Sequence, residues 1–133
     1  MLQETWERWE PIATQIEECC AIDFIDTEDY FKIFVEIDSY KAFEIIFKQP
    51  LCFYRVTIEI CTIQRVSSLK HQYGNLFDPR WIFFKIKNSS LMHDLGIDTS
   101  TGFLEKKPTH FAIIDTESVT DIVSADEPEI RWL

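Results

Sequence analysis

The side chains best suited to chemistry are few and lie far apart along the chain. They are four cysteines and three histidines: Cys19, Cys20, Cys52, Cys61, His71, His93 and His110. A thiol or hydroxyl nucleophile needs a base within hydrogen-bonding distance, and folding could pair His110 with Cys52 or Cys61. No glycine-rich turn of the kind that forms an oxyanion hole accompanies any cysteine or serine. We therefore expect no catalytic residue, and we predict a structural His110 whose ring bonds a neighbouring carbonyl group.

Cofactor and metal sites also lack their usual residues. With three glycines in 133 residues, the chain contains neither GxGxxG nor GxxxxGK. Zinc needs clustered Cys or His ligands, whereas Cys19 and Cys20 are adjacent and Cys52 and Cys61 belong to a strand-like stretch. We expect no cofactor and no metal ligand. Free buried thiols are favoured over two disulfides, because the chain is long enough to form a core without cross-links.

Charge is distributed very unevenly along the sequence. Residues 1–40 hold eleven acids against two bases, residues 41–110 six acids against ten bases, and residues 111–133 six acids against one base. The formal net charge is −10. Such a field repels phosphate, so we expect no nucleic-acid partner. It attracts a basic protein and raises its association rate, although the same acidity could serve solubility alone.

Two groups of acids are therefore candidates for contact with a partner protein. The first group lies near the end of the sequence and comprises Asp115, Glu117, Asp121, Asp126, Glu127 and Glu129. The second group is Glu17, Glu18, Asp23 and Asp26. Aromatic residues near such acids, among them Tyr73, Trp81 and Trp132, are typical anchors of a protein interface.

The periodicity of apolar residues predicts the elements that must position these groups. Apolar residues from Trp6 to Cys20 follow helical spacing, so we expect a helix that begins near Pro11, with Trp6 and Trp9 in a preceding turn. Alternation predicts strands over 31–37, 43–47, 54–60, 81–86, 111–114, 119–123 and 130–133. Asn88-Ser89-Ser90 predicts the start of a short helix that Gly96 ends. We expect an α+β fold: a curved antiparallel sheet with an N-terminal helix and one or two short helices packed on it.

The chain is expected to form one globular domain over 1–133, a length near the mode for single domains. No stretch approaches the roughly 18 apolar residues of a membrane-spanning helix. The first residues are acidic, where a secretory signal would be basic and then apolar. We expect a cytoplasmic protein without a membrane partner, more readily a monomer than a homo-oligomer.

A group of small bacterial proteins shows similar short motifs over residues 43–133. The motifs are Phe47-Lys48-Gln49-Pro50, Tyr54-Arg55, Trp81, Asn88-Ser89-Ser90, His110-Phe111-Ala112-Ile113, Asp121-Ile122-Val123 and Pro128. In size and acidity this group resembles the immunity proteins of polymorphic-toxin and contact-dependent growth-inhibition systems. The resemblance implies a protein that binds a cognate toxin domain, often a basic nuclease, and blocks its active or target-binding site.

Other functions remain open from the sequence. A small enzyme or ligand-binding domain would use a pocket near His110, and a deep, closed pocket that holds His110 and a carboxylate would favour it. A filled core with a flat acidic face would favour inhibition of a partner. A structural adaptor subunit is the third alternative, and a stable homo-oligomer with an apolar interface would favour it.

Overall fold

The computed structural model of the chain describes residues 4–10, 21–37, 41–49, 53–58, 67, 71–72, 83–96, 108–114 and 118–133, with side chains for all except 21, 53–58 and 118. Within these ranges the strands are β1 (Thr5–Arg8), β2 (Ala21–Asp26), β3 (Tyr30–Glu36), β4 (Ala42–Lys48), β5 (Phe53–Ile58), β6 (Phe83–Lys87), β7 (Thr109–Ile114), β8 (Ser118–Ser124) and β9 (Glu129–Trp132). The helix with described bounds is α2 (Ser90–Asp94). In the described part of the chain, no helix has the length and apolar character needed to span a membrane.

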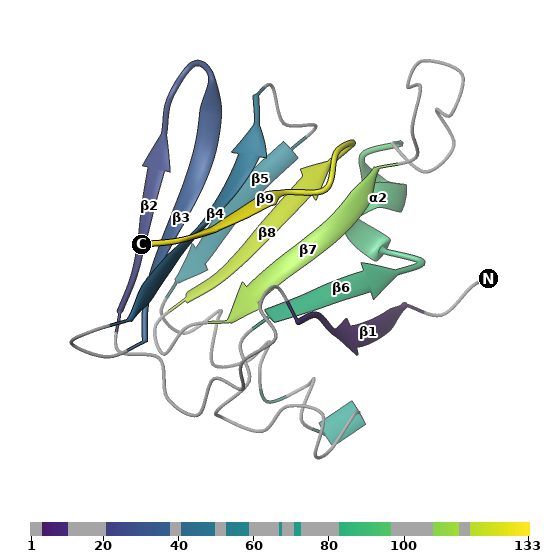
Figure 1. Ribbon diagram of the computed structural model, residues 1–133. Coiled ribbons are helices and arrows are strands. Elements are labelled where there is room, and N and C mark those ends of the chain that lie inside the picture. Colours follow the sequence, from purple (N-terminus) through teal and green to yellow (C-terminus); the bar gives the residue numbers. More distant parts are fainter. Residues whose placement is uncertain are drawn as a thin grey trace.

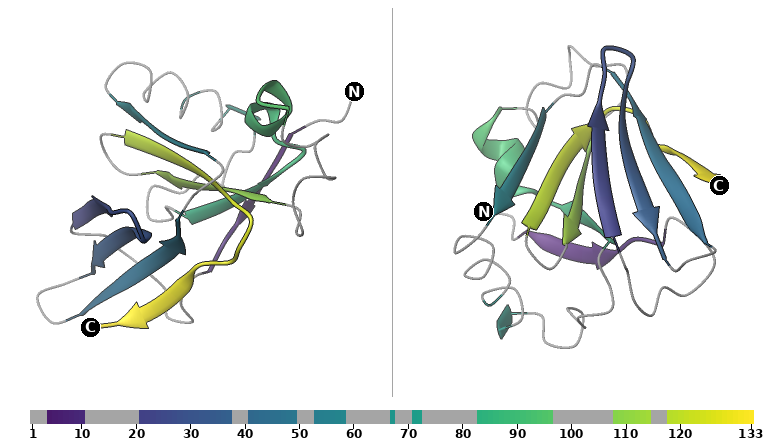
Figure 2. Two further views of the ribbon diagram at one scale, coloured as in Figure 1. Left: turned by 90° about the horizontal axis from the view of Figure 1, so that it is seen from above. Right: turned by 90° about the vertical axis from the view of Figure 1, so that its left-hand side faces the viewer.

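The strands form two antiparallel sheets that face each other (Figures 1 and 2). Sheet A has five strands in the order β1-β6-β7-β8-β5, and sheet B has four in the order β2-β3-β4-β9. Consecutive strands β4 and β5 belong to different sheets, as do β8 and β9. The C-terminal strand β9 thereby pairs with β4 and becomes an edge of sheet B.

Aromatic side chains fill the space between the sheets. On β3 buried residues alternate with half-buried ones, as expected for a strand with one face against a core. Phe47 of sheet B meets Phe111 of sheet A with ring centroids 5.2 Å apart, and Phe43 meets Phe83 at 6.1 Å. All four rings are fully buried. Each contributes about 1.5–3 kcal/mol of hydrophobic stabilisation, so this layer holds the two sheets together.

A second apolar cluster covers the other face of sheet A, which we call the outer face of that sheet. It contains Trp6, Phe84, Ile86 and Ala112, with the Trp6 and Phe84 rings 5.6 Å apart. Strands β6 and β7 are thus buried on both faces, which explains why their sequences read as continuous apolar runs rather than as alternation.

Helix α2 lies on this same outer face. Ser89 caps its start by accepting a hydrogen bond from the Met92 backbone N–H at 3.1 Å, and the buried Met92 side chain faces inward. Gly96 follows the helix with φ of +72°, a conformation that glycine adopts without steric cost. The short helix expected between the Asn88-Ser89-Ser90 sequence and Gly96 is therefore confirmed.

Within the described residues, the strands expected from 31–37 onward correspond to β3 through β9; residues 59–60 and 81–82, the ends of two of these expected strands, lie outside that part of the chain. The expected fold class, however, is wrong: the protein is mainly β, with two sheets rather than one curved sheet, and it is not an α+β domain with an N-terminal helix. Trp6, expected in a turn, is buried in β1, which pairs with β6 some eighty residues away. Long-range pairing of this kind overrides local helical spacing. Residues 11–20, where the helix was expected, and all four cysteines lie outside the described residues.

Candidate functional site

The face of sheet B that turns away from sheet A carries a mixture of apolar and charged side chains; we call it the outer face of sheet B. The strand register places its residues in two neighbouring rows. One row runs across the four strands through Asp23, Phe34, Glu44 and Arg131. The next runs through Ile25, Lys32, Ile46 and Glu129. Directly opposed residues of antiparallel strands share a face, so these eight side chains form one surface.

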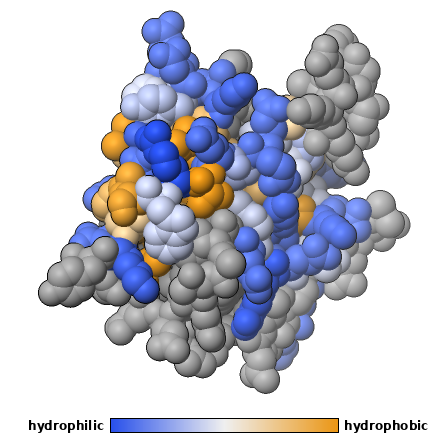
Figure 3. All heavy atoms as spheres, in the orientation of Figure 1, coloured by the Kyte–Doolittle hydropathy of each residue, from blue (hydrophilic) through white to orange (hydrophobic). Residues whose placement is uncertain are grey.

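Apolar groups occupy part of this surface. Ile25 is 45% exposed, and Phe34 and Ile46 are half-buried. Figure 3 looks onto this side of the molecule and shows apolar residues in orange among polar residues in blue over β2 to β4. At the β9 edge of the sheet, Trp132 is 48% exposed, but it pairs with Phe43 and packs on that ring at 5.6 Å, so it lies on the side of β9 that turns toward sheet A.

An ion cluster crosses the middle of the surface. The Glu44 carboxylate binds Lys32 Nζ at 3.3 Å through Oε1 and Arg131 Nη2 at 3.0 Å through Oε2. Burial raises the pKa of Glu44, but the hydrogen bonds and charges of Arg131 and Lys32 outweigh it and hold the pKa below its ordinary value. Glu44 therefore stays ionised and ties β3, β4 and β9 together.

The structure brings together parts of the two acidic groups expected from the sequence. Asp23 and Glu129 are exposed at the β2 and β9 edges of the outer face of sheet B, one from each group. Asp26 is exposed at the end of β2, where Gln49 Nε2 donates a hydrogen bond of 2.7 Å to its Oδ1. The β2–β3 hairpin adds the exposed acids Glu28 and Asp29 beside it.

Other members of those groups lie elsewhere. Asp126 and Glu127 are exposed between β8 and β9, and Glu127 binds Lys85 of sheet A at 3.1 Å. Asp121 is fully buried on the outer face of sheet A and so presents no carboxylate to a partner. The remaining members, Glu17, Glu18, Asp115 and Glu117, are outside the described residues, as are Tyr73 and Trp81.

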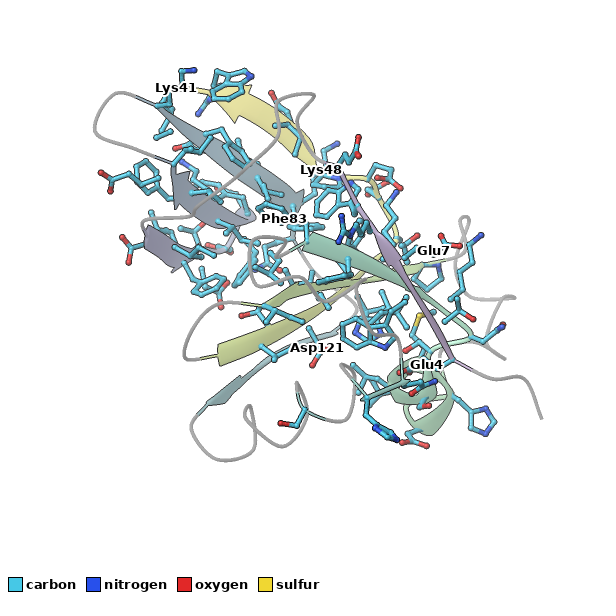
Figure 4. All side chains as sticks on the ribbon, turned by 90° about the horizontal axis from the view of Figure 1, so that it is seen from below. Glu4, Glu7, Lys41, Lys48, Phe83 and Asp121 are labelled. Carbon is cyan, nitrogen blue, oxygen red and sulfur yellow. The ribbon has the colours of Figure 1, made fainter. Side chains whose placement is uncertain are left out.

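A second cluster lies in sheet A, where three polar side chains form a chain of hydrogen bonds beneath α2. His110 Nδ1 is 2.6 Å from Ser89 Oγ, and His110 Nε2 is 2.7 Å from Asp121 Oδ1. His110 and Asp121 are buried, with side chains 1% and 0% exposed. The ring of His110 thus bonds a hydroxyl and a carboxylate, so the expectation of a carbonyl partner is wrong. Figure 4 shows Asp121 on the α2 side of sheet A.

The donors of this chain follow from the chemistry of its groups. An ionised carboxylate only accepts, so His110 Nε2 carries the proton that bonds Asp121. With a single proton on the ring, Nδ1 accepts from the Ser89 hydroxyl, whose oxygen in turn accepts from the Met92 N–H. In this assignment each of the three hydrogen bonds has one donor and one acceptor.

Hairpin register could have revealed part of this cluster. His110 pairs with Val123, and Asp121 pairs with Ala112, so the two polar residues are diagonal neighbours on one face of the β7–β8 hairpin. The signal is one polar residue within each of two apolar strands, at positions of the same parity. In the sequence, Ser89 could be recognised only as a residue at the start of a short helix, not as a partner of His110.

Comparison with protein-family models, with curated proteins and with solved structures found no match to this chain. Arguments about function therefore rest on the outer face of sheet B and on the hydrogen-bonded cluster of Ser89, His110 and Asp121.

Proposed function

We propose that this chain is an immunity-type inhibitor that binds a basic partner protein, such as a toxin domain, through the outer face of sheet B. One observation carries the proposal: acids from opposite ends of the sequence flank exposed apolar side chains on a single sheet face. Asp23 and Glu129 stand at the two edges, with Ile25, Phe34 and Ile46 in the same rows.

This arrangement has the anatomy of a protein interface. Interfaces combine desolvated apolar or aromatic anchors with a polar, charged rim. Ile25, 45% exposed, is the large apolar group on this face that a partner would cover. Since Glu44 already binds Lys32 and Arg131, the two bases of the rows are engaged within the face. The rim acids then determine the sign of the field that an approaching partner meets.

The acidic β2–β3 hairpin extends this field beyond the two rows. Asp26, Glu28 and Asp29 are exposed within four residues of one another. A basic partner is attracted over about a Debye length, roughly 10 Å at 0.1 M salt, and associates faster than a neutral one. Fast association matters to an inhibitor, because it must reach the partner before the partner reaches its target. In this proposal the inhibitor works in the cytoplasm, as a monomer, and without chemistry.

The test is co-expression with the product of the neighbouring gene, followed by co-purification and stopped-flow association kinetics. Asp23→Lys combined with Glu129→Lys should lower the association rate by roughly tenfold at low salt and flatten its salt dependence. Asp94→Lys is the matched control, because Asp94 is exposed on α2, on the other side of the molecule. It should leave the rate close to that of the wild type.

Two results would oppose the proposal. A purified complex that associates equally fast with and without the double reversal would exclude this face as the docking surface. An equal effect of Asp94→Lys would mean that net charge alone governs association, as expected if the acidity serves solubility.

A further inference from the structure

The Ser89–His110–Asp121 cluster places a carboxylate and an imidazole among apolar side chains, where burial of such groups costs free energy. Asp121 is fully buried, and the residues next to the pair on the outer face of sheet A are Ala112 and Val123. Removing a carboxylate from water costs several kcal/mol even after relaxation, and well-packed apolar residues often replace such buried pairs without loss of stability. Buried titratable groups held by specific partners are enriched at functional sites.

The three groups also follow the order of an activated nucleophile. Ser89 is the least buried of the three, 6% exposed, and it lies between the exposed residues Asn88 and Ser90. His110 lies behind it and Asp121 is the most deeply buried. A hydroxyl nucleophile, a base within 2.6–3.2 Å and a third group that orients the base define this type of site. The distances here are 2.6 and 2.7 Å.

We propose that Ser89 is a nucleophile activated by His110 and Asp121, and that the outer face of sheet A holds an acyl-transfer site for small activated esters. This site is independent of the surface on sheet B and of the proposed binding function.

The reaction balances with water as the only co-reactant. Ser89 Oγ forms a bond to the ester carbonyl carbon while His110 Nδ1 takes its proton. The bond to the leaving alcohol breaks, and the alcohol oxygen receives that proton. Water then attacks the acyl-serine, releases the acid and restores the hydroxyl. Asp121 keeps its negative charge throughout, holds Nε2–H and stabilises the imidazolium that forms.

The nitrogen order suits this role. Nδ1 faces the serine and Nε2 faces the carboxylate. A general base needs one ring nitrogen that accepts the serine proton and a second whose N–H is held by an acceptor. Nδ1 and Nε2 can each fill either of these two roles.

A carboxylate just before β1, that of Glu4, blocks the site in this structure. The backbone N–H of Ser90, the residue after the nucleophile, donates to Glu4 Oε2 at 2.7 Å. In hydrolases with a nucleophile on a strand-to-helix turn, the N–H after the nucleophile stabilises the oxyanion. Here β6 is followed by such a turn, with Asn88 at φ of +53°. Glu4 therefore occupies the donor that a tetrahedral intermediate would need, and its charge repels an oxyanion. Figure 4 shows Glu4 beside α2.

The experiment uses a fluorophosphonate, which reacts when the serine oxygen displaces fluoride from phosphorus and the proton passes to His110. Peptide mass spectrometry locates the adduct, and hydrolysis of p-nitrophenyl acetate is the second readout. Glu4→Ala should label Ser89 at least tenfold faster than the wild type, because one oxyanion donor is worth roughly 10²–10³ in rate. Glu4→Gln keeps an acceptor without the charge and should fall between the two.

The matched controls test the base. In the Glu4→Ala background, His110→Gln should reduce labelling by about 10² or more, the usual contribution of a general base. His93→Ala removes an exposed histidine of the same helix and should leave the rate unchanged. Within one sample, the exposed Ser67 should stay unmodified.

Three outcomes would overturn the proposal. They are a folded Glu4→Ala protein without an adduct on Ser89, equal labelling of Ser67 and Ser89, and equal rates with and without His110. The comparison of Ser67 with Ser89 needs only the Glu4→Ala protein, so it decides the matter even if His110→Gln does not fold.

Discussion

Two adjacent residues of β8 should respond to mutation with opposite signs. Thr120 and Asp121 are both 0% exposed, but they point to opposite faces of sheet A. Thr120 stands opposite Ile113 in the core between the sheets, and among the described residues its Oγ1 has no hydrogen-bond partner. Asp121 has the His110 ring at 2.7 Å. The buried hydroxyl of Thr120 therefore lowers the stability of the fold, whereas the hydrogen bond to His110 offsets the cost of burying the Asp121 carboxylate.

The magnitudes follow from these contacts. A buried polar group without a partner costs about 1–3 kcal/mol, and valine replaces the hydroxyl by a methyl group of similar shape. Thr120→Val should therefore stabilise the fold by about 1 kcal/mol and raise Tm by about 3–5 °C for a chain of this length. A hydrogen bond to a charged group contributes about 1.5–3 kcal/mol. Asp121→Asn should accordingly destabilise by about 2 kcal/mol.

Urea unfolding followed by tryptophan fluorescence measures both changes. Asp126→Asn makes the same chemical change as Asp121→Asn at an exposed position and should alter the free energy of unfolding by less than about 0.5 kcal/mol. The reasoning fails if Thr120→Val lowers stability, or if Asp121→Asn is as harmless as Asp126→Asn.

Three further predictions concern the ion cluster, the helix end and the proposed interface. Glu44→Gln should destabilise by about 1–2 kcal/mol at pH 7. Because Arg131 and Lys32 hold the pKa of Glu44 below 4.5, this stabilisation is complete above that pH and is lost as the pH falls further, so wild-type and variant unfolding curves should converge in acid. Gly96→Ala should cost about 1 kcal/mol, since φ is +72° and an added Cβ meets no atom within 4 Å; Gly96→Asn should cost less, and equal thermal midpoints for both would contradict this explanation. Ile25→Asn should leave the thermal midpoint within about 2 °C but weaken partner binding by roughly tenfold or more in titration calorimetry, and unchanged binding would remove Ile25 from the interface.

The strands that were predictable owe their pattern to one buried face. On β3, Phe31, Ile33 and Val35 are buried and their neighbours are not, so the period of two is visible in the sequence. The Ser89 cap and Gly96 act within a few residues of α2, and local chemistry of this kind is also readable. Strands β1 and β2 were not predicted, and for β1 the structure shows why. β1 is four residues long with one buried side chain, and its partner β6 is remote in sequence.

Both candidate sites depend on pairing between distant segments. Asp23 and Glu129 share a face because the chain leaves sheet A after β8 and β9 pairs with β4, whereas charge counting alone assigned them to separate groups. The same counting included Asp121, whose burial only the folded structure reveals. Ser89 reaches His110 because α2 folds onto the outer face of sheet A.

By itself, the sequence determined the acidity of the chain, the strands from β3 onward and the short capped helix, because these depend on composition and on contacts between near neighbours. The tertiary structure decided that the strands form two sheets, that Asp23 and Glu129 stand at the two edges of one sheet face, and that a serine, a histidine and an aspartate meet beneath α2. Strand order, sheet switching and side-chain burial are properties of long-range packing. Local patterns of apolar and polar residues do not specify such long-range packing, because it depends on how all the strands pair in the complete fold.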